Sequence, residues 1–172
     1  KTAWEGVRAQ GMPPADRGGH SCVGLRGGRW QIVFGGANGD ALFADAHVLL
    51  TPAATADGSF RWQPLHLDGG PCARWAHACV SWAGSVAIVM GGHSGLHGAL
   101  GDVAALDELA EPTESAGSVP CPSSLRWVEP ARLRIAGAPP TPRYGHAACC
   151  RGDSIWLLGG IVTFDALAVA DL

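Results

Sequence analysis

Short apolar runs recur along the whole chain, mostly about four to seven residues long and rich in Val, Ile, Leu and Trp. Gly, Pro, Asp and Ser separate them. Runs of this length are too short for ordinary helices and are typical of strands bounded by turns. The runs come in groups of four, and the groups repeat. The pattern therefore predicts an all-β chain built from four-stranded units.

Three copies of one motif organise these groups. The motif reads Pro-x-x-Arg-x-x-His and occurs at Pro14–His20, Pro71–His77 and Pro140–His146. In each copy a Gly pair ends the second run, an Asp opens the third, and a Trp precedes the motif. The Gly pairs are Gly35-Gly36, Gly91-Gly92 and Gly159-Gly160, the Asp residues are Asp45, Asp102 and Asp165, and the Trp residues are Trp4, Trp62 and Trp127. Four features in a constant order indicate a structural repeat.

This set of residues resembles the kelch-repeat family. The resemblance rests on the Pro-x-x-Arg-x-x-His motif, the Gly pair, the Asp and the Trp, and it covers nearly the whole chain. It implies a β-propeller whose four-stranded blades radiate around a central channel, commonly serving as a protein-binding module. A single blade cannot bury both of its faces, so neighbouring blades must supply the core.

The repeat predicts a kelch-type propeller segment over residues 1–172, made of three four-stranded blades. Blade one is expected over about residues 12–67, blade two over about 70–129 and blade three over about 138–172. The strands are expected near His20–Leu25, Gln31–Phe34, Asp45–Leu50 and Phe60–Leu67, near His77–Trp82, Val86–Met90, Asp102–Leu106 and Leu125–Val128, and near His146–Cys150, Ser154–Leu158 and Asp165–Leu172.

Both ends of this pattern are incomplete. Trp4–Val7 is expected to be the outer strand of a preceding blade, and blade three lacks a fourth strand. Known propellers close with at least about four blades. Three blades alone would expose two apolar faces, so we expect a segment of a larger propeller, or one completed by another chain. Residues 1–172 alone should then aggregate or oligomerise.

Two segments depart from the repeat. Residues 107–124 form an insertion in blade two that carries four acidic residues, no basic residue and three Pro. This composition predicts a mobile acidic surface loop, with an acidic tether for a basic partner as the alternative. The connection from Gly159 to Asp165 is shorter than its counterparts, so it is either a tight loop or lacks residues near Gly160.

Charge and hydropathy exclude several classes of protein. The net charge is −3 and only 16% of residues are charged, whereas a general binder of nucleic acid or anionic membrane needs a basic excess. No apolar run approaches the roughly 20 residues of a membrane-spanning helix. The N-terminus shows neither an apolar signal core nor an initiator Met, which suggests a processed or excised piece.

The six Cys residues are too sparse for a disulfide scaffold and predict free thiols in a reducing, cytoplasmic setting. A cytoskeletal or organellar assembly is an alternative location. Cys22, Cys79, Cys149 and Cys150 lie in apolar or small-residue runs and are expected to be buried, with a redox role for the Cys149-Cys150 pair as the alternative. Cys72 and Cys121 lie in Pro-flanked loops and are expected to be exposed.

No catalytic or metal-binding set assembles in the sequence. The recurring His20, His77 and His146 are a blade apart and therefore too distant for one ion. His93 and His97 share a Gly-containing loop without a third ligand nearby. Copper oxidases of the family would need tyrosine ligands, and Tyr144 is the only Tyr. We therefore expect no enzymatic activity, no metal and no cofactor.

The loops from second to third strand and the loops between blades should share one face of a propeller. Loops on a rigid scaffold often carry binding. The candidate partner-binding residues on that face are Arg17, Asn38, Arg74, Trp75, His93, His97, Arg143 and Tyr144. An Arg–aromatic set is typical of interface hot spots. Two alternatives remain open: the Arg residues could instead tie loop carbonyls together, and Trp75 and Tyr144 could pack between blades.

These features favour a non-catalytic scaffold that binds protein partners, and neither nucleic acid nor membrane. One alternative is a regulatory or substrate-recognition propeller attached to a catalytic or ligase-adaptor domain outside the segment. Another is a structural subunit of a large assembly, in which a neighbouring surface covers the open blade faces.

Overall fold

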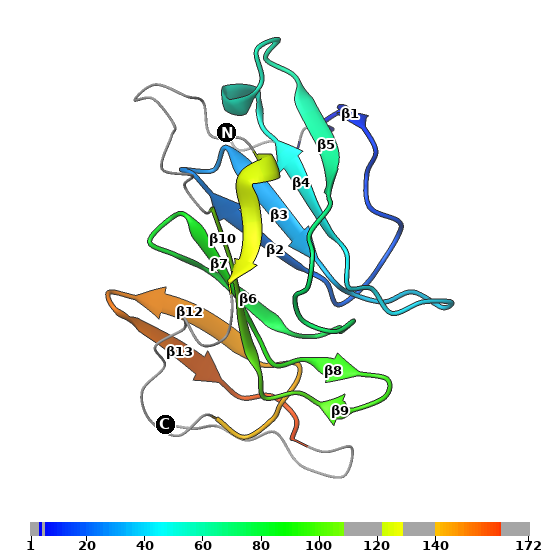
Figure 1. The fold of residues 1–172 in the computed structure, drawn as a ribbon, viewed down its shortest axis with the longest axis vertical. Helices are drawn as coiled ribbons and strands as arrows, with labels where there is room; N and C mark the ends of the chain where they lie inside the picture. Colours follow the sequence, from blue (N-terminus) through cyan, green and yellow to red (C-terminus); the bar gives the residue numbers. More distant parts are fainter. Residues whose placement is uncertain (1–3, 5, 109–121, 129–139, 163–172) are drawn as a thin grey trace.

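The computed structural model describes residues 4, 6–108, 122–128 and 140–162. In these residues the regular structure is strands plus two short 3-10 turns, η1 (Pro52–Ala54) and η2 (Pro122–Ser124) (Figure 1). The predicted all-β class is confirmed. No helix in the described part of the chain is long and apolar enough to cross a membrane.

The first sheet corresponds to blade one. Its antiparallel strands are β2 (Ser21–Leu25), β3 (Trp30–Phe34), β4 (Ala46–Leu50) and β5 (Phe60–Leu65). These strands coincide closely with the predicted runs, because alternating apolar residues and turn residues mark both strand and boundary.

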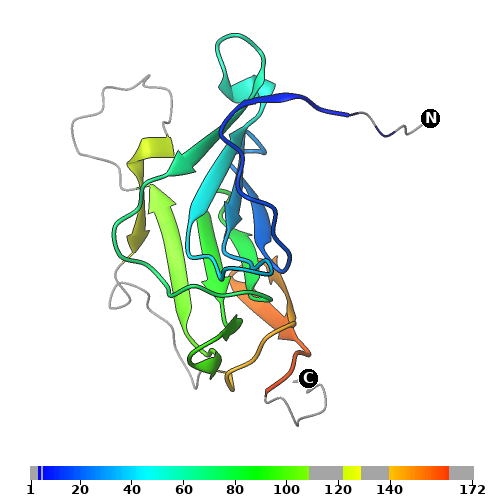
Figure 2. The ribbon, with the colours of Figure 1, turned by 90° about the vertical axis from the view of Figure 1, so that its right-hand side faces the viewer.

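The N-terminal strand differs from the prediction. It is β1 (Ala9–Gly11), which pairs in parallel with β5 at the outer edge of blade one (Figure 2). The expectation of a preceding blade's strand at Trp4–Val7 is therefore wrong for the described residues. The outer edge of β5 offers unpaired backbone groups, and β1 satisfies them. Trp4 lies outside the sheet and is fully exposed.

The second sheet corresponds to blade two and runs in the order β11-β10-β7-β6. Its strands are β6 (Ala78–Trp82), β7 (Val86–Met90), β10 (Val103–Glu108) and β11 (Leu125–Val128). Between β7 and β10 a separate hairpin forms from β8 (His93–Ser94) and β9 (Gly98–Ala99), where the sequence indicated only a loop. Most of the predicted acidic loop, residues 109–121, lies outside the described residues.

The third sheet contains β12 (Ala147–Arg151) and β13 (Ser154–Leu158), which form an antiparallel pair. They match the first two predicted strands of blade three. The predicted third strand over Asp165–Leu172 lies outside the described residues, as does the shortened connection after Ile161-Val162.

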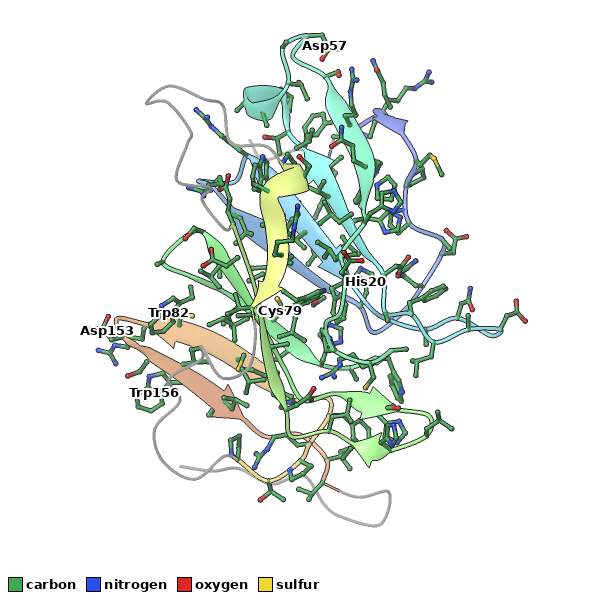
Figure 3. All side chains as sticks on the ribbon, viewed as in Figure 1. His20, Asp57, Cys79, Trp82, Asp153 and Trp156 are labelled. Atoms are coloured by element: carbon green, nitrogen blue, oxygen red, sulfur yellow. The ribbon has the colours of Figure 1, made fainter. Side chains whose placement is uncertain are left out.

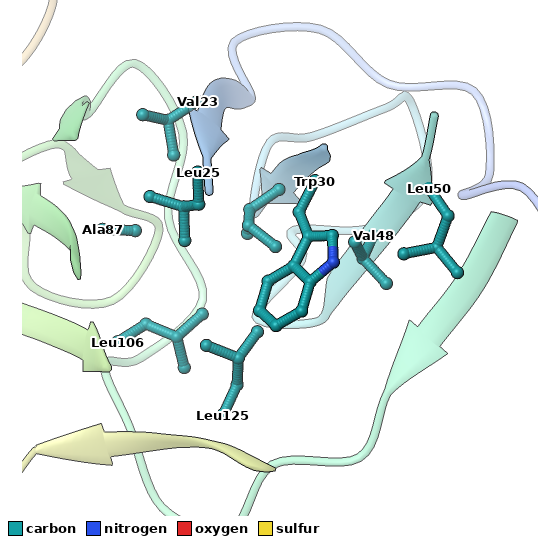
Figure 4. Packing of buried hydrophobic residues seen from close by; sticks show 9 residues of the cluster. Val23, Leu25, Trp30, Val48, Leu50, Ala87, Leu106 and Leu125 are labelled. Atoms are coloured by element: carbon teal, nitrogen blue, oxygen red, sulfur yellow. The ribbon is translucent and has the colours of Figure 1, made fainter. Parts of the chain in front are cut away.

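The sheets stack on one another through their first strands. β6 lies against β2 on one side and against β12 on the other (Figure 1). Between blades one and two the main apolar cluster includes Val23, Leu25, Trp30, Leu106 and Leu125 (Figure 4). A second cluster around Val80 and Met90 joins blade two to blade three. The segment is therefore a stack of propeller blades whose core lies between the sheets.

The cysteines are less buried than the sequence suggested. Cys22, Cys149 and Cys150 are exposed, and only Cys79 is partly buried. For Cys22 and Cys149 the strand positions were predicted correctly, but burial also requires a covering sheet, and the described residues place none over the outward faces of blades one and three. Cys72 is exposed, as predicted. Cys121 lies outside the described residues.

Candidate functional site

The repeated Arg holds each blade together from within. Both terminal nitrogens of Arg74 donate hydrogen bonds to the Asp102 carboxylate at 2.7 Å. The guanidinium also donates to Gly91 O at 2.9 Å and to Cys72 O at 3.1 Å. Its side chain is fully buried. One planar guanidinium thereby links the motif, the Gly pair and the Asp that precedes the third strand.

The other two copies repeat this arrangement as far as the described residues extend. Arg17 donates to the Asp45 carboxylate at 2.5 and 3.0 Å and to Gly35 O at 3.1 Å. Arg143 donates to Gly159 O at 3.1 Å. The three guanidinium groups thus serve the blades and are not presented to solvent. These contacts favour the alternative that Arg17, Arg74 and Arg143 tie loop carbonyls together, so we do not count them among the partner-binding residues.

The repeated His packs against the Gly pair of the blade before it. His77 Nε2 lies 2.8 Å from Ser21 Oγ of blade one, and its ring faces Phe34 edge-on at 5.3 Å. Burial, with Arg74 as a lesser cause, lowers the pKa of His77 to about 4. The neutral ring of His77 therefore packs between blades one and two and has a structural role. Among the described residues no group of three His, Cys, Asp or Glu could hold a metal ion.

Backbone hydrogen bonds join successive blades at the same end of the molecule. Gly36 N donates to Arg74 O at 2.8 Å, and Gly92 N donates to Arg143 O at 2.9 Å. A second series runs from Gly145 N to Ala76 O at 2.7 Å, and from Ala76 N to Gly19 O at 2.8 Å. These bonds turn the loops at this end into a rigid platform.

Three aromatic side chains meet on this platform. Trp75 lies 5.9 Å from His93 and 5.8 Å from Tyr144, and His93 meets Tyr144 edge-on at 5.0 Å between ring centroids. Mutual backbone hydrogen bonds between Trp75 and His93 hold the first pair in place. His93 and Tyr144 are buried whereas Trp75 is half-buried. The group therefore spans blades two and three, and Trp75 alone keeps substantial exposure.

The β8–β9 hairpin, whose first strand begins with His93 of this group, projects from the sheet of blade two (Figure 1). At its tip, Leu96 is 91% exposed and His97 is also exposed. Sequence reasoning missed Leu96, although an apolar residue inside a Gly-flanked turn was an available signal. Asn38 is exposed on the corresponding loop of blade one, where its Oδ1 accepts hydrogen bonds from Asp40 N and Ala41 N. We call Asn38, Trp75, Leu96 and His97 the loop face.

The two carboxylates bound to the repeated Arg residues remain partly accessible at this end. The Asp45 side chain is 41% exposed and the Asp102 side chain 48% exposed. Burial alone would raise the pKa of Asp45, but the hydrogen bonds and charge of Arg17 bring it below its usual value. Asp16 and Asp40 are exposed nearby. The loops at this end thus expose carboxylates in addition to the residues of the loop face, while the arginines beneath are buried.

Comparison with known proteins agrees with this architecture. The KLHDC2/KLHL20/DRC7 Kelch-repeats domain matches residues 1–160. Adagio-like protein 3 of Oryza sativa subsp. japonica is 30% identical over 168 residues, which are 97% of this chain and 23% of that protein.

Two further relatives match most of the chain at lower identity. Acyl-CoA-binding domain-containing protein 4 of Arabidopsis thaliana is 28% identical over 91% of this chain and 20% of its own length. Rho GTPase-activating protein gacHH of Dictyostelium discoideum is 27% identical over 86% of this chain and 8% of its own length. The chain thus spans about a fifth or less of these two relatives. Its repeats, its stacked sheets and the match over residues 1–160 show that it belongs to the kelch-repeat family, whose domains are generally non-catalytic protein-interaction modules.

Proposed function

We propose that the chain is a non-catalytic scaffold that docks a protein partner on the loop face. The observation that carries this proposal is the nearly full exposure of Leu96 on the hairpin whose first strand carries His93, the ring partner of Trp75. A large apolar side chain held on a rigid hairpin is costly to leave in water and is a ready anchor for a partner. The platform hydrogen bonds support this, because little ordering entropy remains to be lost on binding.

Charge defines the kind of partner that fits. Asp16 and Asp40 are exposed in the loops of blade one, and the repeated arginines already hold Asp45 and Asp102. A protein segment that combines an apolar side chain with Lys or Arg would complement both properties. The same charge sign disfavours nucleic acid and anionic membrane as partners. A cytoplasmic location stays a prediction from the unpaired cysteines.

The test uses peptides selected from a displayed random library against the chain. We expect Leu96→Asp and Trp75→Ala to weaken binding of the selected peptides about thirtyfold, the effect of losing an anchor of about 2 kcal/mol. Arg29→Ala is the control, because this exposed residue lies on the β2–β3 turn at the opposite end. Circular dichroism checks that each variant folds. Peptides that lose affinity with Arg29→Ala but not with Leu96→Asp would contradict the proposal.

A second candidate function is a regulatory or substrate-recognition propeller attached to another domain. It is supported by the relatives, which are about five times longer or more and whose names include an acyl-CoA-binding domain and a Rho GTPase-activating protein. Remaining blades would then come from the same or another chain. Sequencing the full-length transcript tests this candidate: a catalytic or adaptor domain beside the repeats supports it, and a transcript encoding repeats alone contradicts it.

A further inference from the structure

The residue after the repeated Arg differs in size between the blades. It is Trp75 in blade two and Tyr144 in blade three, but Gly18 in blade one. In every blade this residue forms a β-bridge with the residue that follows the Gly pair. The bridges are Gly18–Ala37, Trp75–His93 and Tyr144–Ile161. Blade one therefore carries two small residues where the other two blades carry large ones.

The step from blade one to blade two matches the step from blade two to blade three. Equivalent backbone hydrogen bonds join both pairs of blades, at 2.8 and 2.9 Å in the first series and at 2.8 and 2.7 Å in the second. Trp75 and Tyr144 occupy successive positions along this platform, with ring centroids 5.8 Å apart. A side chain at position 18 would therefore lie relative to Trp75 as Trp75 lies relative to Tyr144. The structure describes both sides of this junction.

The side-chain positions of Gly18 and Ala37 beside Trp75 form what we call the open position. A Cβ at Gly18 would meet no described atom within 4 Å beyond its chain neighbours, and its φ is not positive, so the fold does not require glycine there. The Trp75 ring reaches over the backbone of blade one, because its Cε3 would lie 3.3 Å from a Cβ at Gly19. His20 follows at this end of blade one (Figure 3). Trp75 is accordingly only half-buried.

We propose, on the basis of the docking function proposed above, that the partner places a Tyr or Trp side chain in the open position against Trp75. The site belongs to the loop face, because Trp75 and Asn38, the residue after Ala37, are both members of it. The chain itself supplies the template for the contact, since Tyr144 packs on Trp75 at 5.8 Å with an interplanar angle of 49°. Aromatic pairs favour tilted or offset arrangements with centroids roughly 4.5–7 Å apart. The partner's ring would thus extend the row of rings onto blade one.

Carboxylates in the same loops favour an aromatic residue that carries a hydrogen-bond donor. Asp16 lies two residues before Gly18, Asp40 lies three residues after Ala37, and both are exposed. A Tyr hydroxyl or a Trp indole N–H can donate to such acceptors, whereas Phe has no donor. The carboxylates also favour a Lys or Arg next to the aromatic residue. The occupant is therefore a segment of a partner protein with Tyr or Trp beside a basic residue.

The first test fills the open position from within the chain. Gly18→Tyr adds to blade one the ring that the partner should supply, so binding of the library-selected peptides should weaken at least about tenfold. Gly39→Tyr is the matched control, because Gly39 is exposed in the same blade and a Cβ there also meets no described atom within 4 Å. It should bind within about twofold of the wild type. Circular dichroism checks folding, and equal losses in the two variants would overturn the proposal.

The second test changes the peptide and leaves the chain intact. The selected peptides should share a Tyr or Trp beside Lys or Arg. Replacing that aromatic residue with Ala should weaken binding to the wild-type chain at least about tenfold. The same replacement should add little further loss in Gly18→Tyr, because both changes remove one contact. Selected peptides that share Lys or Arg but no aromatic residue would overturn the proposal and assign a cation to Trp75.

The two proposals fail in distinguishable ways. If Leu96→Asp weakens binding and Gly18→Tyr does not, the aromatic occupant is wrong and docking on the loop face stands. If neither variant weakens binding, docking on the loop face is wrong as well. Loss of binding in both variants, with Gly39→Tyr unaffected, supports both proposals.

Discussion

Each position of the repeated Gly pair needs glycine because other atoms lie too close for a side chain. A Cβ at Gly91 would lie 2.6 Å from Arg143 O of the next blade, and a Cβ at Gly92 would lie 2.8 Å from His77 Cβ of its own blade. The two residues also have φ values of +57° and +102°, which other L-residues rarely adopt. The pair is therefore the point where the backbones of neighbouring blades touch.

Gly91→Ala should lower the free energy of unfolding by about 3 kcal/mol, because it combines left-handed backbone strain with a clash against a carbonyl. Gly95→Ala is the control four residues away, where a Cβ would meet nothing within 4 Å. It should change stability by less than about 0.5 kcal/mol. Urea unfolding followed by Trp fluorescence measures both. Equal effects of the two variants would refute the close-approach explanation.

Arg74→Lys tests whether geometry or charge matters in the blade interior. A lysine keeps the charge but cannot reach both Asp102 oxygens, Gly91 O and Cys72 O together, so we expect a loss of about 2 kcal/mol. Arg29→Lys at an exposed turn should be nearly neutral. Urea midpoints compare the two variants. If Arg74→Lys were also neutral, the hydrogen bonds of Arg74 would not be holding the blade.

At the scale of elements, most strands were predictable and two features were not. Alternating burial in β4 (Ala46–Leu50) follows the apolar positions of the sequence directly. β1 was misplaced because its pairing with β5 joins residues about 50 apart, and its short Ala9–Gly11 sequence has no apolar alternation. The β8–β9 hairpin was missed because each of its strands has only two residues.

The contact between blades should weaken in mild acid. The folded-state pKa of His77 is lowered from 6.5 to about 4, chiefly by burial. Protons therefore bind the unfolded chain first, and stability that is full above pH 6.5 is lost as the pH falls toward 4. Between pH 7 and pH 5 the loss should be roughly 2 kcal/mol. Urea unfolding at the two pH values measures it.

His77→Gln provides the control for this pH dependence. The Gln amide can still hydrogen-bond Ser21 but does not titrate, so most of the loss between pH 7 and pH 5 should disappear. Burial also lowers the pKa of His146, which leaves a smaller residual slope. The pKa of Asp45 is lowered from its ordinary value of 3.8, so this group changes the stability only at pH values near and below 3.8. That range lies outside the interval from pH 7 to pH 5. An unchanged slope in His77→Gln would assign the pH dependence to other groups.

At the scale of the whole molecule, the described residues cover blade two on both sides and blade three on one. β6 has neighbours in β2 and β12, whereas β13 leaves Trp156 exposed. Amides of β12 and β13 should therefore exchange with solvent at least about tenfold faster than those of β6 and β7. Hydrogen exchange measured by mass spectrometry tests this. Equal protection would mean that the blades open as one unit.

The sequence by itself determined the strand class, the repeat and the order of the strands within each blade. These properties follow from local spacing of apolar and turn residues, and three copies made the spacing unambiguous. Only the tertiary structure decided which polar side chains face inward. Arg17 and Arg74 appeared suitable for a partner, but their Asp acceptors and the Gly carbonyls that they bind are 17 to 28 residues away in sequence. Burial of Cys22 or Trp156 likewise depends on a neighbouring sheet, which no local pattern specifies.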